Sequence, residues 1–228
     1  MTMSIDAIIV AAGSGSRLGA QLPKAFVPLG GKPLFMHSVL LFEKHLSIEK
    51  IIIVVPALMI DETKSICSLQ NLCKPVEIVA GGKERWQSVQ NGTKLSHADW
   101  VMIHDCARPF LTIKLIDEII SVSKTFDAVI AATLEVDTIR IFNGNVALET
   151  LDRNKIIRVQ TPQMFRRNSL ENGFSHAATM VIPPTDEAML MQTLNIPIGI
   201  AWGDSMNFKV TTQADLALAE AFCEKQLP

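Results

Sequence analysis

Short apolar runs that alternate with helical segments constrain the fold of this chain more than any other feature of its sequence. Residues 7–10 read Ala-Ile-Ile-Val and residues 51–55 read Ile-Ile-Ile-Val-Val, and both runs are typical of buried parallel strands. The alternation predicts an α/β fold in which a mostly parallel sheet carries helices on both faces. Further strands are expected at 76–79, 100–103, 128–134 and 197–201, and helices at 34–44, 58–69, 84–95, 112–126, 167–179, 186–194 and from Thr212 onward, where Asp215 could complete a capping box.

One segment interrupts this alternation. Residues 138–142 and 146–150 are only half apolar, and they flank Asn143-Gly144, a dipeptide typical of a tight hairpin turn. We therefore expect the stretch from about 136 to 160 to form a β-arm. The predicted fold class is a Rossmann-like, doubly wound α/β fold with a mostly parallel sheet and a protruding β-hairpin arm.

Composition narrows the class of protein. The 228 residues are 48% apolar, which predicts one domain with a substantial core. A net charge of −2 argues against binding to nucleic acid or to a membrane surface. The longest apolar run, 51–60, contains Pro56 and is too short to span a bilayer, and we see no signal peptide. Four cysteines without C-x-x-C spacing predict reduced thiols and a cytoplasmic location.

A glycine- and serine-rich loop follows the first expected strand. Residues 11–19 read Ala-Ala-Gly-Ser-Gly-Ser-Arg-Leu-Gly, and Pro23-Lys24 comes shortly after. Such a loop exposes backbone N–H groups and lets a ligand approach the backbone, and Arg17 and Lys24 add two cations. Amides and cations together indicate a site for an anion, most simply a polyphosphate. The alternative is a tight turn with surface charges.

Two better-known phosphate loops do not fit this chain. The dinucleotide pattern G-x-G-x-x-G needs glycine at Leu18, but the glycine comes one residue later, at Gly19. The P-loop pattern G-x-x-x-x-G-K-[ST] fails at Gly31-Lys32 and at Gly82-Lys83, because neither pair has the earlier glycine or a following Ser or Thr.

Candidate site residues also follow two other expected strands. Gly81-Gly82, with Arg85 and Ser88, comes after the strand at 76–79, and the motif His-Asp-Cys-Ala-Arg-Pro, 104–109, comes after the strand at 100–103. Ligands of open α/β sheets bind beyond the carboxyl ends of the strands. We therefore expect these residues and the glycine loop to surround one site.

These motifs together resemble one family. The loop pattern G-x-G-x-R-x-G-x-x-x-P-K is similar to the nucleotide loop of sugar-nucleotide pyrophosphorylase-like nucleotidyltransferases. In its order and spacing of motifs, the chain resembles the 2-C-methyl-D-erythritol 4-phosphate cytidylyltransferase family from about residue 7 to residue 222. The other motifs that carry the resemblance are G-G-x-x-R-x-x-S-V at 81–89, H-D-x-A-R-P at 104–109, Val-Asp-Thr at 136–138, Asp-Arg-Asn at 152–154, Gln-Thr-Pro-Gln-Met-Phe at 160–165, Thr-Asp-Glu at 185–187 and Asn-Phe-Lys-Val-Thr at 207–211.

The resemblance implies an enzyme of the non-mevalonate isoprenoid pathway. It would transfer a cytidylyl group from CTP to the polyol phosphate 2-C-methyl-D-erythritol 4-phosphate, giving CDP-methylerythritol and pyrophosphate. The attacking phosphate oxygen is already anionic, so the site must supply positioning and positive charge rather than a nucleophile or a strong base. The resemblance also implies a single nucleotidyltransferase domain over 1–228, a homodimer formed through the arm, and Mg²⁺ as cofactor.

The same resemblance assigns roles to individual residues. Arg153, from the arm, would serve the site of the partner subunit, and Asp105 would hold Mg²⁺. The expected catalytic residues are Arg17, Lys24 and Lys209. The expected nucleotide-binding residues are Ala11, Ala12, Gly13, Gly15, Gly82 and Ser88. The expected substrate-binding residues are Asp105, Arg108, Thr138, Arg153, Thr185 and Lys209.

Several of these residues have structural alternatives. Arg85 could belong to an ion pair that only supports the structure. Thr138 could simply begin a strand, and Thr185 could be only the N-cap of the next helix. Cys106 stands where relatives usually carry Ala or Ser, and we expect a buried inert thiol there. Lys83 stands where an acidic residue is common.

Two other functions remain open from the sequence. A ribitol 5-phosphate cytidylyltransferase uses a similar loop and a similar polyol phosphate, but the 104–109 motif and the Asp152-Arg153 pair favour the erythritol enzyme. A non-catalytic nucleotide-sensing protein is the other alternative. The joint presence of Lys24, Asp105, Arg108 and Lys209 argues against it, because a sensor could lose the carboxylate that holds the metal.

Overall fold

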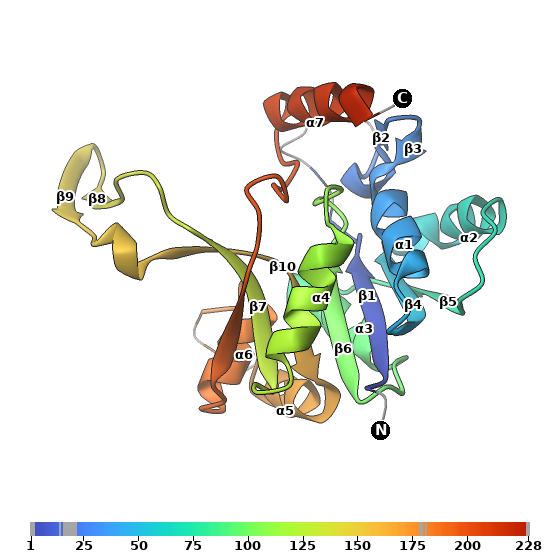
Figure 1. The fold of residues 1–228 in the computed structure, drawn as a ribbon, viewed down its shortest axis with the longest axis horizontal. Helices are drawn as coiled ribbons and strands as arrows, with labels where there is room; N and C mark the ends of the chain where they lie inside the picture. The colour runs from blue at the N-terminus through green and yellow to red at the C-terminus, as the bar shows by residue number, and fades with distance from the viewer. Residues whose placement is uncertain (1–2, 14, 16–21, 178–179, 181, 227–228) are drawn as a thin grey trace.

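The computed structural model describes residues 3–13, 15, 22–177, 180 and 182–226 (Figure 1). Within these ranges a central sheet has the strand order β11-β7-β10-β6-β1-β4-β5. All its strands run parallel except β10, which is antiparallel to both of its neighbours. The bounds are β1 Ile5–Val10, β4 Ile48–Val55, β5 Val76–Ala80, β6 Trp100–Asp105, β7 Ala128–Leu134, β10 Ile157–Arg166 and β11 Ile198–Trp202.

Helices cover both faces of this sheet, as the sequence predicts (Figure 1). Successive side chains of a strand point to opposite faces, so β1 sends Ile9 into one apolar cluster and Ile8 into the other. The first cluster packs under α1 and α4, and the second under α3, α5 and α6. The helices are α1 Leu34–Lys44, α2 Ile60–Ser68, α3 Arg85–Thr93, α4 Ile113–Val122, α5 Arg167–Ala177, α6 Glu187–Thr193 and α7 Gln213–Gln226.

Strand β10 is the main element that the sequence pattern does not predict. It lies in the middle of the sheet, between β6 and β7, although its residues 160–163 are Gln-Thr-Pro-Gln. The side chains of Gln160, Thr161 and Gln163 are buried and hydrogen-bonded, so they take positions that apolar residues usually occupy. A periodicity of apolar residues therefore cannot detect this strand.

The expected arm is present and projects away from the sheet (Figure 1). It is a hairpin of β8 Arg140–Asn143 and β9 Val146–Thr150, and its turn contains Gly144 at φ 56°. Its first strand begins two residues later than the sequence pattern suggests, and the arm ends before β10 begins at Ile157. Every residue of both strands is exposed.

Backbone hydrogen bonds bring the loops after β1, β5 and β6 to one edge of the sheet. Ala11 N donates to Val54 O, Gly81 N donates to Val55 O, and Cys106 N donates to Val10 O. The loops that carry the candidate residues are therefore fixed side by side. In the part of the chain described, helix length and hydropathy nowhere reach what a membrane crossing requires.

Candidate active site

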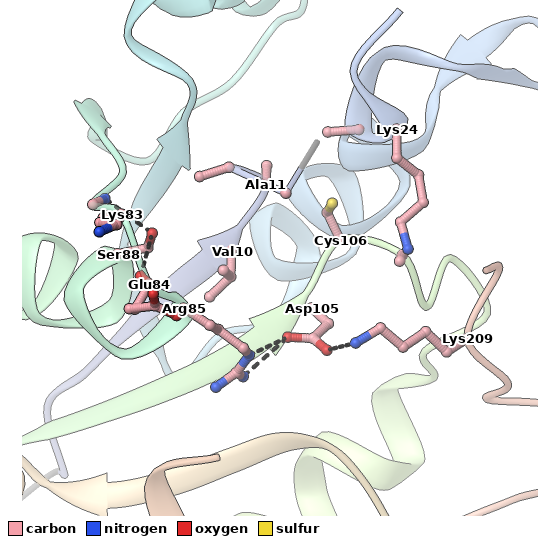
Figure 2. A pocket seen from close by; sticks show the side chains of 15 residues that line it. Val10, Ala11, Lys24, Lys83, Glu84, Arg85, Ser88, Asp105, Cys106 and Lys209 are labelled. Atoms are coloured by element: carbon pink, nitrogen blue, oxygen red, sulfur yellow. Dashed lines mark hydrogen bonds and ion pairs between the residues drawn. The ribbon is translucent and has the colours of Figure 1, made fainter. Parts of the chain in front are cut away.

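A cavity of about 410 Å³ lies beyond the carboxyl ends of β1, β5 and β6 (Figure 2). Five segments far apart in the sequence contribute to its wall: the glycine loop, the turn at Lys24, the loop before α3, the end of β6 and the segment before α7. The structure thus brings together most of the predicted site. The predicted residues that line the cavity are Ala11, Ala12, Gly13, Lys24, Gly82, Ser88, Asp105 and Lys209.

Lys24 faces this cavity from a short 3₁₀ turn, Lys24–Phe26. Its Nζ donates to the carbonyl oxygen of Val210 at 2.9 Å, which holds the turn against the segment before α7. Gly15 has φ +69°, and a Cβ there would lie 2.5 Å from Lys24 Cβ, so only glycine fits beside the lysine. Arg17 and Gly19, which belong to the same motif, lie outside the described residues.

The loop before α3 forms the opposite wall. Gly82 N donates to Ser88 Oγ at 3.0 Å, and a capping box between Glu84 and Gln87 starts the helix. A Cβ on Gly81 would overlap that of Ala12, so a glycine at this position lets the two loops approach each other closely. Ser88 therefore has a structural partner as well as a place in the cavity wall.

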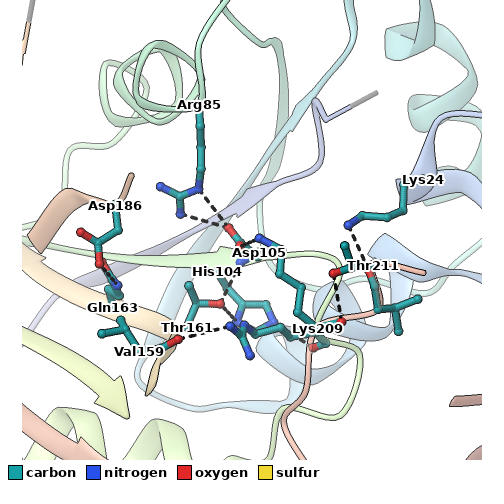
Figure 3. A network of polar contacts seen from close by, with 12 residues as sticks. Lys24, Arg85, His104, Asp105, Val159, Thr161, Gln163, Asp186, Lys209 and Thr211 are labelled. Atoms are coloured by element: carbon teal, nitrogen blue, oxygen red, sulfur yellow. Dashed lines mark hydrogen bonds and ion pairs between the residues drawn. The ribbon is translucent and has the colours of Figure 1, made fainter. Parts of the chain in front are cut away.

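Asp105 lies at the centre of a chain of charges (Figures 2 and 3). Its Oδ2 is 2.6 Å from Lys209 Nζ, and its Oδ1 is 3.0 Å from Arg85 Nη2. Arg85 Nη1 also donates to both carboxylate oxygens of Glu187, each at 2.8 Å, and Glu187 is 1% exposed. Burial alone would raise the pKa of Asp105, but Arg85 and Lys209 outweigh it and hold that pKa well below its usual range. Asp105 is therefore ionised at neutral pH.

The sequence allowed Arg85 to be part of an ion pair that only supports the structure. Arg85 does form ion pairs, with Asp105 and Glu187, but it also lines the wall of the site. Glu187 takes part through Arg85 without lining either cavity, and sequence reasoning did not assign it this role. Its place in the Thr-Asp-Glu motif was the available signal.

A second cavity, of about 220 Å³, adjoins the first. It shares Arg85, Asp105 and Lys209 with the larger cavity, so these three residues form the wall between the two. Its other lining residues are Arg108, Val159, Gln160, Thr161, Gln163, Thr185 and Asp186.

Arg108 and Thr185, which the sequence predicts to bind the substrate, line the second cavity. Arg108 Nη1 donates to the carbonyl oxygen of Asn207 at 2.7 Å, which fixes the guanidinium there. The alternative role of Thr185 is wrong, because the N-cap of α6 is Asp186, whose Oδ1 accepts from Met189 N at 3.2 Å. The sequence did not predict the polar side chains that β10 supplies.

Three described residues of the predicted site line neither cavity: Gly15, which lies beside Lys24, and Thr138 and Arg153. Thr138 and Arg153 are exposed on the arm and at its base. Arg153 Nη1 donates to the carbonyl oxygen of Val136 at 2.8 Å. Within one chain the structure does not bring these two residues to the site.

The family of this chain follows from comparison with known proteins. The model of the family described as IspD, 2-C-methyl-D-erythritol 4-phosphate cytidylyltransferase, matches residues 5–225. The chain belongs to this family. The family predicted from the sequence motifs is therefore confirmed.

Individual relatives agree over nearly the whole chain. A 2-C-methyl-D-erythritol 4-phosphate cytidylyltransferase of Halalkalibacterium halodurans is 38% identical over 221 residues, which cover 96% of each chain. One from Syntrophus aciditrophicus is 36% identical over 231 residues, 99% of this chain and 98% of the relative. A crystal structure of 4-diphosphocytidyl-2C-methyl-D-erythritol synthase from Anaerococcus prevotii superposes with a TM-score of 0.87 at 26% identity, covering 98% of this chain and 97% of the other.

In this member of the cytidylyltransferase family, Cys106 lines the larger cavity and is 4% exposed. Burial raises the pKa of its thiol to about 12, and the charge of Asp105 acts in the same direction. The thiol is therefore protonated at neutral pH and a poor nucleophile, as expected for a buried inert cysteine.

His104 connects β6, β10 and the loop after β6 (Figure 3). Arg108 O can only accept a hydrogen bond, so His104 Nε2 donates to it, at 3.1 Å. Nδ1 then accepts from the hydroxyl of Thr161 at 3.1 Å, and Thr161 Oγ1 accepts from Asp105 N at 3.0 Å. A neutral His104 thus fixes the backbone on both sides of Asp105.

This arrangement predicts a loss of stability in mild acid. Burial lowers the pKa of His104 to about 4, against the hydrogen bond to Arg108 that raises it. Between about pH 6.5 and 4 the unfolded chain binds a proton that the folded chain does not. We expect the free energy of unfolding to fall with decreasing pH, by at most about 1.4 kcal/mol per unit from this group. Urea unfolding at several pH values measures this dependence. In His104→Gln the free energy of unfolding should depend less on pH, and an unchanged pH dependence would contradict the role of His104.

Proposed function

We propose that this chain transfers the cytidylyl group of CTP to 2-C-methyl-D-erythritol 4-phosphate and releases pyrophosphate, the reaction that the names of its relatives indicate. The observation that carries the proposal is the wall of Arg85, Asp105 and Lys209 between two adjoining cavities. A transfer between two phosphates needs two anions held next to each other, each facing cations.

In this proposal CTP occupies the larger cavity and the polyol phosphate the smaller one. The backbone of the glycine loop and Gly82 contact the nucleotide, whereas Arg108 and Thr185 contact the polyol phosphate. An oxygen of the substrate phosphate attacks the α-phosphorus of CTP, and the bond from that phosphorus to the bridging oxygen of the leaving pyrophosphate breaks. Lys24 and Lys209 offset the negative charge that builds up, and no protein nucleophile is required.

The site also fits Mg²⁺ through Asp105. Mg²⁺ is held in proteins by one or two carboxylates and completes its coordination with phosphate oxygens and water. Asp105 is ionised and faces both cavities. Its Oδ1 accepts two hydrogen bonds from Arg85, whereas its Oδ2 accepts one from Lys209 and keeps a lone pair for a metal ion. When bound, the ion would neutralise charge on the phosphate oxygens of CTP.

Asp105→Asn is expected to lower the rate and to weaken its dependence on Mg²⁺. The amide carries no charge for the metal and cannot balance Arg85 and Lys209, which line both cavities. Rates measured over a range of Mg²⁺ concentrations check this. A variant that keeps the Mg²⁺ dependence of the wild type would show that Asp105 does not hold the metal.

Pyrophosphate release with different substrates tests the reaction itself. CTP should be strongly preferred to ATP, GTP and UTP, and methylerythritol phosphate to ribitol 5-phosphate. Equal turnover with UTP would contradict cytidine recognition, and faster turnover with ribitol 5-phosphate would identify the ribitol enzyme instead. CTP binding without turnover of either polyol phosphate would favour the nucleotide sensor.

We further propose a homodimer in which the arm pairs with the partner subunit and Arg153 serves the partner's site. An isolated two-stranded hairpin is marginally stable in water, and its free edges can pair with another chain. The arm exposes Phe142, Val146 and Leu148 at 73%, 61% and 55%. A partner that covers these side chains would supply the stability that a hairpin without a core lacks.

We place the protein in the cytoplasm. Its four cysteines are free thiols, which is the usual state in a reducing compartment. Cell fractionation followed by immunoblotting checks this location, and recovery of the protein from an oxidising compartment would contradict it.

A further inference from the structure

Helix α7 packs on a third apolar cluster, separate from the two on the faces of the sheet. This cluster joins the helix to three segments that each carry a cation of the site. Val27 follows Lys24 by three residues, and Phe110 follows Arg108 by two. The buried members are Val27, Leu29, Leu34, Val210 and Ala219, with Phe110, Phe208, Leu216 and Cys223 packed against them.

Three phenylalanine rings connect α7 to the loops of the second cavity. Phe222 of α7 lies 5.7 Å from Phe110 and 6.5 Å from Phe208, measured between ring centroids. Phe110 and Phe208 are 5.4 Å apart. These distances are within the range of attractive aromatic pairs. Phe208 directly precedes Lys209, so the rings link α7 to both cationic loops.

Polar contacts tie the same segments together. Val210 N donates to Ala107 O at 2.8 Å, and the carbonyl oxygen of Val210 accepts from Lys24 Nζ at 2.9 Å. The expected capping box is present at the start of α7: Asp215 Oδ2 accepts from Thr212 N at 2.7 Å, and Thr212 Oγ1 accepts from Asp215 N at 3.2 Å. The chain is thus fixed from the cationic loops into the first turn of the helix.

We propose that α7 is a positioning element of the active site: the docking of Phe222 on Phe110 and Phe208 holds Arg108 and Lys209 in place for the phosphate of the second substrate. Among the described residues, none of α7 lines either cavity, so the helix acts through the segments on which it packs. Coupling of this kind is reciprocal. A phosphate that binds Arg108 and Lys209 therefore stabilises the docked helix. The proposal rests on the proposed function for the identity of the substrate.

Phe222→Ala tests the first half of the coupling. We expect KM for methylerythritol phosphate to rise roughly 5- to 20-fold, since two aromatic contacts are lost. KM for CTP should rise less, because Arg108 lines only the second cavity. Phe222→Leu should give an intermediate effect. Leu218→Ala is the matched control, because Leu218 lies on the same helix and is 50% exposed, and its KM values should match the wild type.

Thermal unfolding separates this role from a general loss of stability. Assays are run well below the Tm of each variant, so that all the protein is folded, and Phe222→Leu replaces Phe222→Ala if the latter does not fold. An unchanged KM in a folded Phe222 variant, or an equal change in Leu218→Ala, would overturn the proposal.

Amide hydrogen exchange tests the reverse effect, the stabilisation of α7 by a bound phosphate. Methylerythritol phosphate should slow exchange in α7 of the wild type, and the slowing should be smaller in Phe222→Ala. Inorganic phosphate provides the same test without turnover. Protection of α7 by phosphate in a protein that turns over no polyol phosphate would contradict the proposed function and support the role of α7. Unchanged α7 exchange in wild-type protein, with phosphate binding verified by calorimetry, would overturn that role.

Discussion

Lys24→Ala is expected to lower kcat by roughly 10²–10³-fold, the usual effect of removing one preorganised donor to charge in a transition state. Lys24 lines the cavity proposed for CTP, and Val210 holds its ammonium group in place. The ammonium group is therefore positioned before substrate binds. Its effect should be largest when charge moves onto the leaving pyrophosphate, so kcat at saturating CTP is the measurement.

This variant should remain folded but lose about 1–2 kcal/mol of stability, because the hydrogen bond from Lys24 Nζ to the carbonyl oxygen of Val210 is removed. Lys64→Ala is the matched control: Lys64 is an exposed lysine on α2, paired with Asp61 at 3.4 Å, and its removal should leave kcat unchanged. Near-normal turnover of folded Lys24→Ala would show that Lys24 does not stabilise negative charge in the transition state.

The fold was predictable where burial is achieved with apolar residues. The strands at Ile51 and Ala128 are continuous apolar runs buried on both faces, and a central parallel sheet requires such runs. Strand β10 lies as deep in the sheet, but Gln160, Thr161 and Gln163 are buried through hydrogen bonds to groups that a sequence does not place beside them. Its position depends on tertiary partners, and apolar periodicity carries no information about those.

The candidate site shows the same division. Residues at strand ends, such as Gly82 and Asp105, were predictable because parallel strands deliver their carboxyl ends to one edge. The role of Glu187 was not, because it depends on Arg85 reaching a residue 102 positions away. The contribution of Phe222 was hidden too, since a phenylalanine on a helix predicts only that some apolar surface is near.

Arg153→Ala is expected to be nearly inactive as a homodimer. In the proposed homodimer this arginine binds the phosphate of the partner's substrate, and alanine cannot replace two parallel hydrogen bonds. In one chain Arg153 contacts Val136 O on the exposed arm and lines neither cavity. Because Arg153 lies outside both cavities in one chain, a strong loss of activity would indicate that it acts in a second subunit, unless the substitution unfolded the arm. Circular dichroism and sedimentation of the variant test whether the arm and the dimer remain intact.

Mixing the two inactive variants then tests which subunit Arg153 serves. Lys24→Ala and Arg153→Ala, refolded together in equal amounts, should form mixed dimers in about half of the molecules. Each mixed dimer combines an intact Lys24 with the partner's intact Arg153 in one of its two sites. Activity should recover to roughly a quarter of the wild type if assembly is random and the sites are independent. If Arg153 served its own subunit, one site of the mixed dimer would lack Lys24 and the other Arg153, and no activity would return. No recovery, with mixed dimers verified by mass, would therefore overturn the shared site.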